Sequence, residues 1–299
     1  KIISAVVNFP LTRRILSTKI GFALFIAAAR FYSYCTWHAQ TEKRLRKMGF
    51  TAPIRYIDHH TSHMFSALAT SGWNDCVVIS LDAQGDGYCS RVGTFKNGTF
   101  REIHKTHFFN SPAHFYAYVT FILGFKPFNH EGKITGLAAF GKPHATGPLF
   151  KERLSYDTKK HSFVNKGFYI RPEIAHLTKT LRGFSKEDVA AGIQAHLEET
   201  VVAFVQDTLE QLKANKAKIA LAGGVFANVK LNQRIAALQS VEDIYIYPNM
   251  GDGGLAAGAA FRLLYDIDPQ AFRPYRLEHA YLGPDYAHDE IVSEIQKRG

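Results

Sequence analysis

The chain has 299 residues, of which 46% are hydrophobic, so it can bury one large core or two smaller ones. Its formal net charge of +10 suits a nucleic acid, an anionic membrane surface or a phosphorylated substrate as partner. The basic residues are scattered, without a basic stripe interleaved with aromatics or a zinc-finger spacing, which weighs against a nucleic-acid-binding protein. Three cysteines without CxxC spacing indicate free thiols in a reducing, cytoplasmic environment.

The N-terminal part is first apolar and then charged. Residues 20–29 form the most apolar run, which is far shorter than the roughly 20 residues of a membrane-spanning helix. We therefore expect no membrane segment and interpret residues 16–49 as one or two core-facing helices, with residues 42–48 as their charged outer end. The chain begins with Lys1 rather than Met, which suggests that part of the natural N-terminus lies upstream.

A histidine-rich stretch follows a short strand expected at residues 54–57. His59 and His63 are four residues apart, so on a helix their imidazoles share one face and can bind a single divalent metal. The alternative is that these histidines cap and pack the start of a helix. The pair alone does not decide between the two interpretations, and the residues downstream carry the argument.

An acidic residue follows the next strand. Residues 76–81 are a continuous apolar run with β-branched residues, typical of a buried strand, and Asp82 comes directly after it. α/β proteins place ligands at such strand ends, whereas Asp86-Gly87 is also a strong signal for a hairpin turn. We expect both, with Asp86-Gly87 leading into strands at 88–95 and 99–104 and with Asp82 facing a site.

Two further segments carry candidate ligand contacts. Gly132 and Lys133 stand at the start of an apolar helix, where backbone N–H groups and a lysine charge can hold a phosphate. Asp188 lies at the start of a long core-facing helix expected from residue 189 to about 214, where a structural role and a ligand contact are both open. Residues 146–185 are expected to form a peripheral hairpin or insertion.

Two glycine turns follow buried strands in the last third of the chain. The strand at 218–222 runs into Gly223-Gly224 and Asn228, and without Cβ atoms this backbone can lie against a nucleotide. The strand at 244–247 runs into a glycine loop that carries Asp252. This position is of the same kind as that of Asp82, although Asp252 could instead cap the helix that follows.

His59, His63, Asp82 and Asp252 together offer two imidazoles and two carboxylates. This mixed nitrogen and oxygen set suits Fe(II), Mn(II) or Zn(II), with positions left open to a substrate. The sequence thus predicts a divalent metal site, with the glycine turn at 223–224 able to hold a nucleotide nearby.

The order and content of these motifs resemble the carbamoyltransferase family of nodulation and antibiotic-tailoring enzymes (the NodU, CmcH and TobZ type). The resemblance implies a Kae1-like form of the actin/Hsp70/sugar-kinase (ASKHA) α/β fold, with two α/β lobes around a nucleotide cleft and the first lobe incomplete. It extends over about residues 55–260 and rests on five motifs: Asp58-His59-His60-Thr61-Ser62-His63, Asp82-Ala83-Gln84-Gly85-Asp86-Gly87, Glu131-Gly132-Lys133-Ile134-Thr135-Gly136-Leu137-Ala138-Ala139-Phe140-Gly141, Gly223-Gly224-Val225-Phe226-Ala227-Asn228 and Gly251-Asp252-Gly253-Gly254.

The resemblance also implies a reaction. Family members use ATP and carbamoyl phosphate to form carbamoyl-adenylate, and the Kae1-like domain transfers the carbamoyl group to a hydroxyl of a sugar or natural product. The ligands of Fe(II) or another divalent metal would be His59, His63, Asp82 and Asp252, with the first three also catalytic. The nucleotide and its phosphates would be held by Gly132, Lys133, Asp188, Gly223, Gly224 and Asn228.

The same resemblance predicts the domain organisation. Residues 1–299 would be a partial Kae1-like domain, with one lobe over about 1–185, a second over about 186–275, and no C-terminal YrdC-like domain. Such a fragment would not make the adenylate by itself. Two alternatives stay open: a Kae1-like domain that transfers threonylcarbamoyl to tRNA, which the positive charge favours, and a truncated module that binds nucleotide and metal without activity.

Overall fold

A computed structural model of the chain describes residues 21, 24–25, 28, 32 and 34–298. Five strands of this described part form one mixed sheet in the order β3-β2-β1-β6-β7. β1 (Asp75–Gly85), β2 (Tyr88–Lys96) and β3 (Thr99–His107) form an antiparallel meander, and β6 (Ala217–Ala222) and β7 (Val241–Ile246) extend it in parallel from β1. The predicted α/β fold class is confirmed.

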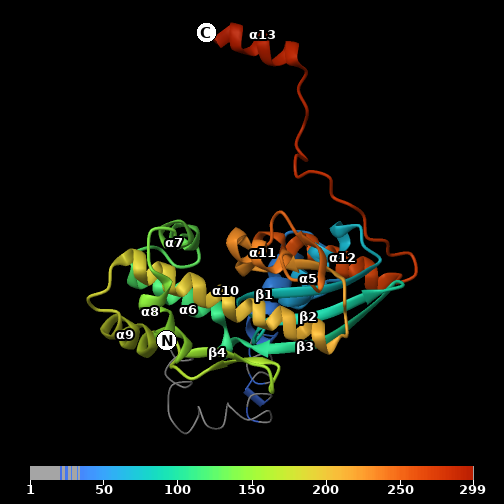
Figure 1. Cartoon of the computed structure of the whole chain (residues 1–299). Helices are drawn as coiled ribbons and strands as arrows, with labels where there is room; N and C mark the ends of the chain where they lie inside the picture. The colour runs from blue at the N-terminus through green and yellow to red at the C-terminus, as the bar shows by residue number, and fades with distance from the viewer. Residues whose placement is uncertain (1–20, 22–23, 26–27, 29–31, 33, 299) are drawn as a thin grey trace.

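Alternating side chains on the central strands divide the core between the two faces of the sheet. Val77, Ile79 and Leu81 of β1 point to the face that α6 (Pro112–Ile122) and α10 (Lys186–Gln211) cover. Cys76 and Val78 point to the opposite face, which α5 (His59–Ser71) and α12 (Leu255–Ile267) cover. Figure 1 shows the long helix α10 crossing the sheet, with α5 and α12 grouped together.

The sheet combines strands from both sides of the lobe boundary that the sequence predicts near residue 185. Ile79 of β1 lies opposite Leu221 of β6 in a parallel pair, so β1 and β6 belong to one sheet. The division at residue 185 therefore does not coincide with a boundary between sheets.

The peripheral hairpin expected within residues 146–185 is present. β4 (Leu154–Asp157) and β5 (Ser162–Asn165) form an antiparallel pair between α8 (Pro143–Lys151) and α9 (Arg171–Thr180). The hydroxyl of Tyr156 donates to Asp207 of α10 at 2.6 Å, which ties the hairpin to the main body. α7 (Glu131–Ala138) precedes this insertion and packs beside α10.

The N-terminal expectations are met only in part. The run at 20–29 falls largely outside the described residues. α4 (Ala39–Lys47) is a helix as predicted, but none of its nine residues is buried, so it is not core-facing. Leu45 is its one large apolar residue, which is too little for a buried stripe. Residues 54–57 are not a strand, because no described strand pairs with them.

The described residues bear on two further predictions, free thiols and the absence of a membrane segment. Cys76 and Cys89 are buried and unpaired in disulfides, and burial raises the pKa of Cys76 to about 12. The side chain of Cys35 lies outside the described part. Among the helices that the structure describes, none combines the length and the apolar content that crossing a bilayer requires.

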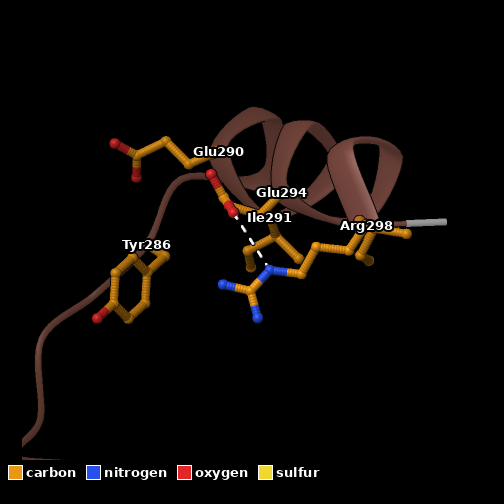
Figure 2. A pocket seen from close by; sticks show the side chains of 6 residues that line it. Tyr286, Glu290, Ile291, Glu294 and Arg298 are labelled. Atoms are coloured by element: carbon orange, nitrogen blue, oxygen red, sulfur yellow. Dashed lines mark ion pairs between the residues drawn. The ribbon is translucent and has the colours of Figure 1, made fainter.

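The C-terminal helix α13 (His288–Arg298) stands away from the sheet at the end of an extended segment (Figure 1). Figure 2 shows a hollow beside it, lined by side chains of the helix and by Tyr286. Glu294 and Arg298 pair across its wall at 3.6 Å. This hollow contains none of the site residues that the sequence predicts.

Candidate metal centre

Helix α5 begins where two carboxylates meet its N-terminus. Asp58 caps the helix by accepting a hydrogen bond from the backbone N–H of Thr61 at 3.1 Å. Asp86, in the turn after β1, accepts the backbone N–H of His59 at 2.8 Å. The buried Arg91 of β2 donates to Asp58 at 2.7 Å and balances part of the negative charge. The start of α5 is thereby fixed to β2 and to the β1–β2 turn.

His59 and His63 lie on one face of α5, one turn apart, as the spacing predicts. Their ring centroids are 4.8 Å apart. His63 is fully buried, and 17% of the His59 side chain is exposed. The pair therefore points inward from the first turn of the helix rather than into solvent.

The two carboxylates come from the carboxyl ends of parallel strands. Asp82 lies two residues beyond the last paired residues of β1 and β6, Ser80 and Ala222. Asp252 follows β7 and begins the short helix η4 (Asp252–Gly254), which leads into α12. Parallel strands end at the same edge of a sheet, and this edge is where α/β folds bind ligands. The topology thus brings Asp82 and Asp252 together although 170 residues separate them.

The four side chains converge on one point. The Nε2 atom of His63 lies 3.2 Å from Asp82 Oδ2 and 3.5 Å from Asp252 Oδ1. The Nε2 atom of His59 lies 3.8 Å and 3.5 Å from the same two oxygens. Ligands that share an ion at about 2.1 Å lie at most about 4.2 Å apart, so each of these four nitrogen–oxygen distances fits a shared ion.

Hydrogen bonding alone does not account for this arrangement. Within the described residues, the buried Nε2 atoms of His59 and His63 have no well-aligned hydrogen-bond partner, although the carboxylates are close. Such orphaned nitrogens aimed at two carboxylate oxygens fit a cation better than a set of internal hydrogen bonds. The side chain of Asp252 is 72% exposed, so the group of four side chains is open to solvent on the Asp252 side.

The pKa values report the same close approach. Burial alone would lower the pKa of His63, but the nearby carboxylates of Asp252 and Asp82 outweigh it and raise that pKa. Burial alone would raise the pKa of Asp82, but its interactions with His59 and His63 and with the Ala83 N–H hold it well below its usual range. Without a metal, His63 therefore tends to hold a proton between two carboxylates.

Metal binding is consequently expected to weaken as the pH falls. A metal binds neutral imidazole, so below the raised pKa of His63 each bound ion must displace a proton, and the affinity should fall by about tenfold per pH unit. Asp82 stays ionised over this range because its pKa is lowered. Cobalt(II) titrations of the metal-free protein between about pH 6 and pH 8 check this. An affinity that stays constant over that range would contradict it.

His60, the neighbour of His59, does not belong to the centre. Its Nε2 lies 2.9 Å from the carbonyl oxygen of Tyr88, and its Nδ1 lies 2.9 Å from the hydroxyl oxygen of Ser80. Burial lowers the pKa of His60 to about 4, so the ring is neutral. Both ring nitrogens thus hold α5 on the sheet.

The predicted glycine turn lies directly beside Asp82. Gly223 has a positive φ of 107°, and a Cβ there would overlap the backbone of Leu81. A Cβ on Gly224 would lie 3.2 Å from Asp82 Oδ1. The turn between β6 and the following short helix therefore needs glycine to pass this close to the end of β1.

Asn228 is engaged within the fold. Its side chain caps α11 (Val229–Ala236) by accepting the Leu231 N–H at 3.1 Å. It also exchanges two hydrogen bonds with the side chain of Gln194, at 2.9 and 3.0 Å. Gln194 in turn accepts a hydrogen bond from the hydroxyl of Tyr116 at 2.7 Å. Neither Tyr116 nor Gln194 belongs to a motif in the sequence, because single polar residues on core helices form no recognisable pattern.

The predicted phosphate-binding residues lie apart from the four-ligand group. Gly132 and Lys133 are on α7, which Figure 1 shows well separated from α5. Thr135 of the same helix reaches Tyr116 at 3.0 Å, so α7 joins the network around Asn228. Asp188 accepts the backbone N–H of Lys142 at 2.7 Å, which ties the start of α10 to the segment before α8.

Several known proteins are similar to this chain in sequence. Residues 11–261 match the family model described as the carbamoyltransferase N-terminus. MJ1058, an uncharacterized protein of Methanocaldococcus jannaschii, is 32% identical over 280 residues, which cover 85% of this chain and 44% of that protein. The nodulation protein NolNO of Sinorhizobium fredii is 28% identical over 255 residues, which cover 81% of this chain and 35% of that protein.

The chain spans about half the length, or less, of these curated relatives. Among solved structures, HypF of T.kodakarensis aligns with 74% of this chain and 38% of its own, with a TM-score of 0.43 and 14% sequence identity.

Proposed function

This chain belongs to the carbamoyltransferase family, and from that premise we propose that the protein transfers a carbamoyl group to a hydroxyl of a sugar or natural product. The single observation that carries the proposal is the convergence of His59, His63, Asp82 and Asp252, whose ligand atoms all lie within 4.8 Å of one another. We propose that these four side chains hold one divalent ion, with Fe(II), Mn(II) and Zn(II) all compatible with two nitrogen and two oxygen donors.

A bound ion of this kind would act as a Lewis acid that stabilises charge developing on the carbamoyl donor. The donor in our proposal is carbamoyl-adenylate, made from ATP and carbamoyl phosphate. The acceptor hydroxyl oxygen forms a bond to the carbamoyl carbon, the bond from that carbon to the phosphate oxygen breaks, and AMP leaves. A carboxylate oxygen of Asp82 or Asp252 that does not bind the ion would take the hydroxyl proton, because an imidazole that binds the ion has no free lone pair.

The arrangement of exposed and buried ligands supports a direction of approach for the acceptor. His63 is fully buried and Asp82 is 18% exposed, whereas Asp252 is 72% exposed. We propose that the acceptor hydroxyl enters on the Asp252 side. On the inner side, Gly223, Gly224 and Asn228 would contact the nucleotide, with Gly132 and Lys133 as its more distant phosphate contacts and Asp188 as a further cofactor-binding residue.

The test is a transfer assay with the protein at its natural length, ATP and carbamoyl phosphate labelled on the carbamoyl carbon. We expect label in a small hydroxyl acceptor and release of AMP. Label in tRNA in a parallel assay with ATP, threonine and labelled bicarbonate would instead favour threonylcarbamoyl transfer. If neither acceptor is labelled while the metal content is intact, the protein is a binding module and the proposed transfer is wrong.

A further inference from the structure

Two glycines outside the four proposed ligands are crowded against α5, the helix that carries His59 and His63. Gly85 is at the end of β1, and Gly258 is inside α12. We infer that Gly85 and Gly258 are positioning residues that set the geometry of the metal centre, Gly85 for His59 and Gly258 for Asp252. The inference rests on the proposed metal site and goes beyond it, because neither glycine offers a ligand atom.

Gly85 provides the space that the His59 ring occupies. An ideal Cβ on Gly85 would overlap the Cδ2 and Cγ atoms of that imidazole. The register of β1 with β2 shifts between Leu81 and Gly85, and Asp82 lies in this irregular stretch. The segment from Asp82 to Gly85 thus carries the Asp82 carboxylate and leaves space for the imidazole of His59, whose Nε2 lies 3.8 Å from Asp82 Oδ2. A side chain at 85 would turn the ring away from the shared point.

Asp86 fixes this segment to α5 from the other side. Its carboxylate accepts the His59 backbone N–H at 2.8 Å, so the helix cannot retreat without breaking that hydrogen bond. With the backbone of His59 held and its ring against Gly85, the ring has little freedom to move except by rotation. The absence of a side chain at Gly85 therefore decides the direction of the Nε2 atom.

Gly258 sets the distance between α5 and α12. An ideal Cβ on Gly258 would overlap the carbonyl oxygen of Ser62, which lies next to His63 on α5. Glycine is a poor residue for the interior of a helix, so its place here follows from the close approach of the two helices. η4, which begins with Asp252, leads directly into α12. A side chain at 258 would push α12 outward and carry Asp252 away from His63.

If Gly85 and Gly258 served packing alone, replacing them would lower the stability of the protein without changing its metal affinity. Gly192 of α10 is equally crowded, since its Cβ would overlap the hydroxyl oxygen of Thr146. It lies on the opposite face of the sheet from α5 and contacts none of the four ligands. Gly192→Ala is therefore a matched control that strains the packing without touching the metal centre.

The experiment compares Gly85→Ala, Gly258→Ala and Gly192→Ala in the metal-free protein, with cobalt(II) as the probe. Affinity comes from titration, geometry from the visible absorption of bound cobalt(II), and folding from the thermal midpoint. We expect Gly85→Ala and Gly258→Ala to bind cobalt(II) about 10- to 100-fold more weakly and with an altered spectrum, the range found when partners that orient metal ligands are lost. Gly192→Ala should lower the thermal midpoint and keep wild-type affinity and spectrum.

Gly85→Ala is the deciding variant if Gly258→Ala does not fold, because the nearest neighbours of a Cβ at 85 are side-chain atoms of His59, whereas a Cβ at 258 meets the backbone of Ser62. Folded Gly85→Ala protein with affinity within about twofold of wild type and an unchanged spectrum would overturn the inference. Wild-type protein that binds cobalt(II) but transfers no carbamoyl group would remove the proposed reaction and leave this inference standing. Wild-type protein that does not bind cobalt(II) would overturn both.

Discussion

Replacing His63 with alanine is expected to lower the metal affinity by at least about 100-fold and to abolish carbamoyl transfer. The loss of a direct ligand should exceed the 10- to 100-fold cost of losing a group that only orients one. His63 is the fully buried member of the group, and its Nε2 lies 3.2 Å from Asp82 Oδ2 and 3.5 Å from Asp252 Oδ1. Its removal leaves two carboxylates and one imidazole. Elemental analysis measures the metal content of the purified variant, and a cobalt(II) titration measures its metal affinity.

His196→Leu is the matched control for this substitution. His196 is also buried on a helix, and burial lowers its pKa to about 4, but it lies on α10 beside Phe150 rather than at the carboxyl edge of the sheet. Its variant should keep the metal content and the transfer activity of the wild type. If His63→Ala folds and keeps full metal content, the assignment of the four ligands is wrong.

Replacing Arg153 with leucine is expected to destabilise the protein by about 3–5 kcal/mol, the usual effect of leaving a buried charge unpaired. Glu173 is fully buried, and Arg153 donates to its two oxygens at 2.8 and 2.6 Å. The side chain of Arg153 is 19% exposed, so most of this ion pair is shielded from water. The variant leaves the carboxylate with the hydrogen bond from the Phe168 N–H but without the charge of Arg153. Urea denaturation measures the change in the free energy of unfolding.

The double variant Arg153→Leu/Glu173→Gln separates the lost charge from the lost packing. It should recover part of the stability, because a neutral amide costs less to bury than an unpaired carboxylate. Cobalt(II) affinity should stay at the wild-type value in both variants, since Glu173 is on α9 and touches no ligand. A destabilisation below about 1 kcal/mol in Arg153→Leu would contradict this account of the pair.

The parts of the fold with strong local patterns could be predicted from the sequence. The apolar runs before Asp82, Gly223 and Asp252 are the strands β1, β6 and β7, and each is followed by a residue or turn at one edge of the sheet. The side-chain spacing of α5 places both histidines on one face. Helix period, buried-strand composition and the rule on strand ends sufficed for these features.

Features that depend on packing between distant segments could not be predicted. α4 is exposed because no other element buries its residues. Residues 54–57 form no strand because no described strand lies beside them to pair with. The pairing of Gln194 with Asn228 and the contact of Gly258 with Ser62 join residues from separate elements. A glycine inside a helix can have a packing, a functional or a capping role, and the sequence does not distinguish these roles. The contact with the neighbouring helix identifies the packing role of Gly258.

The central claim is that His59, His63, Asp82 and Asp252 hold one divalent ion on which carbamoyl transfer depends. The most direct test measures transfer by the protein at its natural length before chelation, after chelation, and after adding back Fe(II), Mn(II) or Zn(II). We predict about one ion per chain, loss of transfer when it is removed, and recovery when a fitting ion returns. Full transfer by protein that holds less than about a tenth of an ion per chain would contradict the claim.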